Sequence, residues 1–141
     1  MLNVWNGGEY LNNTTGFFSS THIDLTVSSD WSSKGDKSLL VAGVDDNGGD
    51  LVRLGAGTYE SRTYILKMDI YNPSGEGFNV SFFNSSTNYQ KVTIPQSDEV
   101  THVELTLTPD TTGYLSIRIS ATSNTNFYCD NISIIPITTN L

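Results

Sequence analysis

The chain has 141 residues, of which 37% are hydrophobic, and its seven Lys and Arg stand against fifteen Asp and Glu, a formal net charge of −8. This length predicts a single domain, residues 1–141, and the apolar content suffices for a core, which excludes a disordered chain. Seven scattered cations cannot neutralise a phosphate backbone, and the apolar runs are too short to span a bilayer, so no nucleic-acid and no membrane partner is predicted.

Strands are predicted along the whole chain, because apolar and polar residues alternate and successive strand residues point to opposite faces of a sheet. In order, the predicted strands are 21–27, 37–43, 51–54, 64–70, 78–84, 89–95, 103–107, 113–121 and 127–135. Clusters of Gly, Pro, Asn and Asp between them predict turns, and no window shows the apolar spacing of a helix. The pattern predicts an all-β fold, a two-sheet antiparallel β-sandwich of about nine or ten strands with essentially no helix.

The inward positions of these strands define the expected core. They are Leu39, Val41, Tyr64, Leu66, Met68, Ile70, Phe78, Val80, Phe82, Val92, Ile94, Val103, Leu105, Leu107, Leu115, Ile117, Ile119, Ile132 and Ile134. The single cysteine, Cys129, excludes an internal disulfide. Its apolar neighbours predict a buried, unreactive thiol, because reactive cysteines need an electropositive setting.

Catalytic machinery is not visible in the sequence. A β-sandwich glycosidase needs two carboxylates about 5–9 Å apart, and no such pair alternates on a predicted strand. Glu104 and Asp69 are lone outward carboxylates, and His22, His102 and Cys129 have no zinc-site spacing. The acidic run DDNGGD at 45–50 favours a hairpin turn over a cation site, because its spacing is not that of an EF-hand. We therefore expect that the protein is not an enzyme.

Aromatic residues on predicted outward faces point instead to binding. Phe83, Tyr89 and Tyr114 face outward, and Trp31 lies in a loop. An aromatic ring can stack on the apolar face of a pyranose, while Arg118 and Arg53 present a planar fork of donors to paired hydroxyls. The alternative interpretation is that these aromatics only reflect β-propensity.

Three segments of the sequence form a recognisable set: KSLLV at 37–41, AGTY at 56–59 or RTYIL at 62–66, and NFYCDNISI at 126–134. Together they resemble the jelly-roll carbohydrate-binding modules of the family 4, 9, 16 and 22 group. Those modules show a small-residue-Leu-x-Val strand, a Gly-x-Thr-Tyr-x-Leu strand and a closing aromatic-x-Asp-x-x-Ser-hydrophobic strand. The resemblance covers residues 3 to 137.

This resemblance implies a glycan in the concave groove of one sheet, formed by strands 37–43, 78–84, 89–95 and 113–121. The outer face of that sheet presents Asn79, Ser81, Phe83, Tyr89, Lys91, Tyr114, Ser116 and Arg118, with Trp31 and Arg53 near the rim. A structural Ca²⁺ at the sandwich edge is also implied, where Asp130 matches a ligand of similar modules and Glu9 is the candidate partner. Backbone carbonyls would complete its about six to eight oxygen ligands. Alternatively, Asp130 caps a turn.

The resulting hypothesis is a non-catalytic module that binds polysaccharide or oligosaccharide and targets a larger extracellular protein to glycan. It is expected to act as a monomeric part of a longer secreted or surface-attached chain. The alternative is a structural or receptor-binding domain of a phage or viral tail or capsid, or a surface adhesin. That alternative suits a chain that begins at Met1 without a secretion signal, and a virion protein is expected to form a homotrimer. A small lyase or hydrolase is the third and least favoured hypothesis.

Overall fold

Ten β-strands make up the computed structural model, which describes residues 5–6, 21–54, 62–111 and 114–137. They are β1 (Trp5–Asn6), β2 (Ile23–Ser28), β3 (Ser38–Gly43), β4 (Gly49–Leu54), β5 (Tyr64–Tyr71), β6 (Phe78–Ser85), β7 (Asn88–Ile94), β8 (Thr101–Leu107), β9 (Leu115–Ile119) and β10 (Asn126–Pro136). The described ranges contain no helix, and hence none with the length and apolar character to cross a membrane. The predicted all-β class is confirmed.

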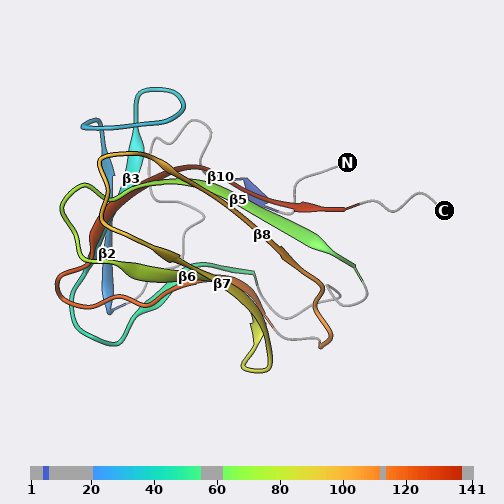
Figure 1. Cartoon of the computed structure of the whole chain (residues 1–141). Coiled ribbons are helices and arrows are strands. Elements are labelled where there is room, and N and C mark those ends of the chain that lie inside the picture. Colours follow the sequence, from blue (N-terminus) through green and yellow to red (C-terminus); the bar gives the residue numbers. More distant parts are fainter. Residues whose placement is uncertain (1–4, 7–20, 55–61, 112–113, 138–141) are drawn as a thin grey trace.

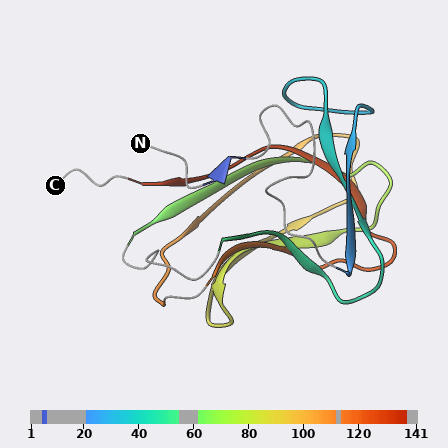
Figure 2. The ribbon, with the colours of Figure 1, turned by 180° about the vertical axis from the view of Figure 1, so that it is seen from behind.

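Two antiparallel sheets pack face to face. The larger sheet has the order β2-β3-β10-β5-β8, with β1 paired to β10, and the smaller has the order β4-β9-β6-β7. In Figure 1 the ribbons of β5, β8 and β10 lie above those of β6 and β7, and Figure 2 shows the same two layers from behind. The predicted sandwich is therefore confirmed.

The core between the sheets matches the predicted inward positions. A stacked pair, Phe78 of β6 and Phe127 of β10, joins the two sheets with ring centroids 4.1 Å apart. Val92 and Leu105 were expected in the core but are only partly buried, because β7 and β8 are the edge strands of their sheets. Cys129 is fully buried, and burial raises the pKa of its thiol well above the ordinary range, as expected for an unreactive cysteine.

One strand belongs to the other sheet. The segment 37–43 was expected in the same sheet as 78–84, 89–95 and 113–121, but β3 pairs with β2 and β10 in the larger sheet, and β4 is the fourth strand of the smaller one, beside β9. Alternation shows which side chains of a strand are buried, and a core between two sheets buries either sheet's inner face equally well. The expected assignment of 37–43 to the groove sheet was wrong for this reason.

The acidic run at 45–50 forms a turn, but the predicted hairpin was wrong, because β3 and β4 lie in different sheets and do not pair. Gly48 has φ +67°, a conformation that favours glycine, and a Cβ there would come within 2.6 Å of the Ile119 carbonyl oxygen. Asp45 accepts a hydrogen bond from the backbone N–H of Asn47 and contacts His22 Nδ1 at 2.9 Å. These contacts lower the pKa of the Asp45 carboxyl, with the His22 hydrogen bond the largest cause. The turn delivers Asp50 onto the first positions of β4.

Candidate functional site

The outer face of the smaller sheet carries polar and aromatic side chains in registered rows. Along β6 buried and half-buried residues alternate, which turns Asn79, Ser81 and Phe83 outward. Strand pairing then aligns neighbours across the sheet, about 4.8 Å from strand to strand. The three rows are Tyr89, Phe83, Ser116 and Arg53; Lys91, Ser81, Arg118 and Asp50; and Thr93, Asn79 and Ser120.

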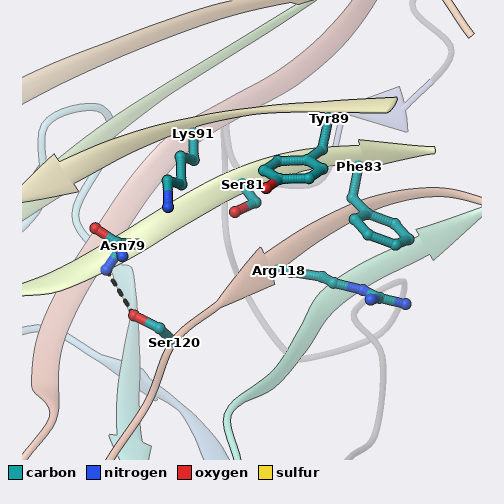
Figure 3. A pocket seen from close by; sticks show the side chains of 7 residues that line it. All are labelled: Asn79, Ser81, Phe83, Tyr89, Lys91, Arg118 and Ser120. Atoms are coloured by element: carbon teal, nitrogen blue, oxygen red, sulfur yellow. Dashed lines mark hydrogen bonds between the residues drawn. The ribbon is translucent and has the colours of Figure 1, made fainter. Parts of the chain in front are cut away.

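A shallow pocket of about 250 Å³ opens on this face, and we call it the sheet pocket. Its lining residues are Asn79, Ser81, Phe83, Tyr89, Lys91, Arg118 and Ser120 (Figure 3). Six of these seven were placed on the outer face of the groove sheet from the sequence. Ser120 was not among them, and it receives a hydrogen bond from the backbone N–H of Asn79 at 2.8 Å.

Stacked groups form the aromatic side of the sheet pocket. The Arg118 guanidinium carbon lies 3.5 Å from the centroid of the Phe83 ring, and Phe83 stacks with Tyr89 at 6.2 Å. A cation over an aromatic face is attracted by the ring quadrupole, so Arg118 is held in place on one side of Phe83. Tyr89 remains 42% exposed and offers its ring to solvent.

Asp50 organises the two arginines of this face. Its carboxylate is only 4% exposed and contacts both side chains. Oδ2 lies 2.8 Å from Arg53 Nε and 2.7 Å from Arg53 Nη2, while Oδ1 lies 2.8 Å from Arg118 Nε. A nearly buried carboxylate must be paired, and here the two guanidinium groups pair it. The sequence analysis assigned Asp50 to a turn and therefore did not name it as a site residue. Its spacing of three residues from Arg53 on one short strand is the sequence signal that could have identified it.

Tyr114 lies beside the sheet pocket without lining it. Arg53 sits over its ring, with the guanidinium carbon 5.0 Å from the centroid, and the side chain is 44% exposed. The backbone of Tyr114 is held by Asn84, a buried amide at the end of β6, whose Nδ2 donates to the Tyr114 carbonyl at 3.3 Å. Tyr114 and Arg53 therefore extend the polar and aromatic surface toward the edge strand β4.

Trp31 lies elsewhere. It was expected near the groove rim, but it packs on the larger sheet, stacked on Tyr71 at 5.3 Å and tilted against Tyr128 at 6.3 Å. Both tyrosines belong to paired positions of β5 and β10. The loop that carries Trp31 joins β2 to β3, and both strands belong to the larger sheet. The wrong placement of Trp31 therefore results from the wrong sheet assignment of segment 37–43.

Asp130 anchors the same loop from β10. Its Oδ2 accepts hydrogen bonds from the backbone N–H groups of Lys34 at 2.8 Å and Ser33 at 3.0 Å. Burial raises the pKa of this carboxyl, and the backbone donors, Lys34 first, oppose the shift. Oδ1 is buried and has no hydrogen-bond partner among the described residues.

These contacts bear on the expected calcium ion. One oxygen of Asp130 already holds two N–H donors, and the described ranges contain no group of three or more His, Cys, Asp or Glu side chains placed to hold a metal. Glu9 lies outside the described residues. The described part of the chain thus supplies one uncommitted carboxylate oxygen, and a calcium ion there stays a prediction that depends on the segment around Glu9.

The lining of the sheet pocket is polar and aromatic. Its side chains offer hydroxyl, amide, ammonium and guanidinium groups beside two rings, and none of its seven lining residues is a carboxylate. Asp50, the single carboxylate of the four strands, is occupied by the arginines. The described residues of this surface thus do not include the pair of carboxylates that most glycoside hydrolases use.

Solved structures share this fold, although no protein-family model and no curated protein matches the sequence. The CBM22-1 xylan-binding domain from Paenibacillus barcinonensis Xyn10C matches with a TM-score of 0.73 and 12% identity, over 98% of this chain and 96% of that one. CBM6cm-2 from Cellvibrio mixtus lichenase 5A, in complex with cellotriose, matches with a TM-score of 0.55 and 16% identity, over 99% and 100%.

A phage protein shares the fold as well. The enzymatically active domain of tailspike protein 4 from bacteriophage CBA120 matches with a TM-score of 0.67 and 12% identity, over 96% of this chain but only 21% of that one. At these identities the likeness establishes the fold alone. The expected jelly-roll architecture of carbohydrate-binding modules is thereby confirmed.

Proposed function

We propose that this chain is a non-catalytic glycan-binding module and that its ligand lies in the sheet pocket. The observation that carries the proposal is the stacked set of Tyr89, Phe83 and Arg118 beside hydroxyl and amide groups on one open sheet face. Exposed aromatic surface together with donors that satisfy sugar hydroxyls is the combination that glycan recognition needs. The xylan-binding and cellotriose-bound neighbours support the same ligand class.

Affinity measurements on a panel of soluble polysaccharides test this proposal. The wild-type chain is expected to bind at least one glycan, and Tyr89→Ala to weaken that binding about tenfold or more, because a stacked ring contributes on the order of 1.4 kcal/mol or more. Tyr71→Ala, which removes a ring of the opposite sheet, is the matched control and should bind like the wild type. Absence of binding to every glycan would overturn the proposal.

The wider setting is part of the same proposal. The module would target a larger secreted or surface protein to polysaccharide, and a calcium ion held by Asp130 and Glu9 would stabilise the edge of its sandwich. Thermal unfolding in the presence of Ca²⁺ and of a chelator tests the ion, with a higher midpoint in Ca²⁺ expected. Equal midpoints would refute the calcium site without touching the sheet pocket.

A second candidate is a receptor-binding or structural domain of a phage tail or capsid, or a surface adhesin, which the match to a tailspike favours. Such a domain would assemble, whereas the module would remain monomeric. Size-exclusion chromatography with light scattering separates the two, because a stable trimer supports the virion assignment and a monomer supports the module.

A further inference from the structure

Positive charge is concentrated on the sheet that carries the sheet pocket. Of the seven Lys and Arg in the chain, three lie on its four strands, Arg53, Lys91 and Arg118, against one carboxylate, Asp50. Three cations and one anion give these strands a formal charge of +2 within a chain of −8. Binding of a neutral sugar does not require a positively charged sheet in a negatively charged protein. The positive charge of this sheet therefore needs another explanation.

Asp50 leaves most of this charge uncompensated. Both of its oxygens are already engaged by the two arginines, and its side chain is 3% exposed, so it cannot also reach a lysine on the far edge strand. Lys91 is exposed on β7, and no ion pair of Lys91 occurs within the described ranges. The sheet pocket therefore contains an ammonium group that no carboxylate of the described chain neutralises.

Strand register places Lys91 and Arg118 on either side of Ser81. Ser81 pairs with Lys91 on one side and with Arg118 on the other, so the two cations flank a small hydroxyl side chain in the same row. All three residues line the sheet pocket, and Figure 3 shows Lys91 pointing toward Ser81 while Arg118 extends beneath Phe83. Two strand spacings separate their backbones, about 9.6 Å, and the space of about 250 Å³ that they help to line can take an anionic group.

We propose that the sheet pocket selects an acidic glycan, whose sugar carboxylate or sulfate lies over Ser81 between Lys91 and Arg118. This inference rests on the proposed function and names its ligand class. Charge-assisted hydrogen bonds to a carboxylate are about twice as strong as neutral ones. The acidic body of the protein repels a polyanion in general, so attraction is confined to this one face and selects glycans that also fit its aromatic rings.

Calorimetric titration with matched polymers tests the inference. The probes are glucuronoxylan and the same polymer after reduction of its carboxyl groups, with sulfated and unsulfated xylan as a second pair. Wild-type protein is expected to bind at least one acidic polymer about tenfold or more tightly than its neutral partner, because a charge-assisted hydrogen bond contributes on the order of 1.4 kcal/mol or more. The pair that shows the preference identifies carboxylate or sulfate as the ligand group.

Variants distinguish this inference from the proposed function. Lys91→Gln is expected to reduce the ratio of acidic to neutral affinity toward one, whereas Lys67→Gln, on the larger sheet, should keep the wild-type ratio. Added salt should weaken the binding of the acidic polymer more than the binding of its neutral partner. Binding of the neutral polymers as tightly as the acidic ones overturns the inference and leaves the proposed function standing. Failure of all four polymers and of the wider glycan panel overturns both.

Discussion

Asp50 and Arg118 face each other on paired strands, with the carboxylate Oδ1 2.8 Å from the guanidinium Nε, and the same carboxylate also holds Arg53. Asp50, which the sequence analysis assigned to a turn, thus holds the guanidinium groups of both arginines of the outer face in position. The rotamers of these arginines are set before a ligand arrives, which lowers the entropy cost of binding.

Removal of the Asp50 carboxylate is expected to lower both the stability of the fold and the affinity for glycan. Asp50→Ala leaves two guanidinium groups without their shared acceptor, and we expect a loss of about 1–3 kcal/mol in the free energy of unfolding. Urea denaturation measures it, with Asp24→Ala, an exposed carboxylate of β2, as the control. A variant as stable as the control would show that the carboxylate is dispensable.

Asn84 is expected to be a stability determinant of the connection that presents Tyr114. Its buried amide donates to the carbonyls of Thr111 and Tyr114, and its Oδ1 accepts from the backbone N–H of Asp110. Asn84→Ala should cost about 2–3 kcal/mol of unfolding free energy, because several buried backbone groups lose their partner.

The exposed Asn124 supplies the matched control for that measurement. Asn124→Ala should remain within about 0.5 kcal/mol of the wild type, as surface substitutions usually do. If the two variants unfold at the same urea concentration, the amide network of Asn84 contributes nothing measurable.

Replacement of Trp31 separates the structure from the sequence expectation. The sequence predicts that Trp31→Ala weakens glycan binding, whereas the ring stacks on Tyr71 and Tyr128 of the larger sheet. We expect unchanged glycan affinity and a loss of about 1–2 kcal/mol of stability from the lost aromatic contacts. A loss of affinity in a variant that remains folded by circular dichroism would contradict this placement.

The pH dependence of stability should identify Asp130. Its folded pKa is raised by burial, so the folded state holds the proton more tightly, and the contribution of Asp130 to stability falls as pH rises from the ordinary carboxyl pKa through the raised one. Asp130→Asn keeps an oxygen for the N–H groups of Ser33 and Lys34 but carries no charge. The stability of this variant relative to the wild type should therefore increase with pH.

Urea denaturation between about pH 3 and about pH 7 brackets this titration. Asp130→Ala serves as the reference, since it removes the acceptor of the loop and should be destabilised at the acidic end, where Asp130→Asn and the wild type are alike. A difference between Asp130→Asn and the wild type that stays constant over this range would argue against the raised pKa.

The sequence correctly predicted which side chains face outward where this depends only on the alternation within one strand. Alternation along β6 and β7 is local, so Phe83, Tyr89 and Lys91 were placed together on one face from the sequence, and the structure brings them together. The choice between sheets is not local: β3 satisfies the core equally in either layer, and its pairing with β2 and β10 decides it. Asp50 was not predicted as a site residue because its role depends on arginines that come from two different strands.

Both tryptophans of the chain belong to the larger sheet and its loop: Trp5 is part of β1, and Trp31 stacks on Tyr71. The sheet pocket, on the opposite layer, is lined by Phe83 and Tyr89 and by no tryptophan. The fluorescence of the Trp31 indole should therefore report the unfolding of the larger sheet. Because Trp31 packs on the layer opposite the sheet pocket, its emission follows folding separately from occupancy of the pocket.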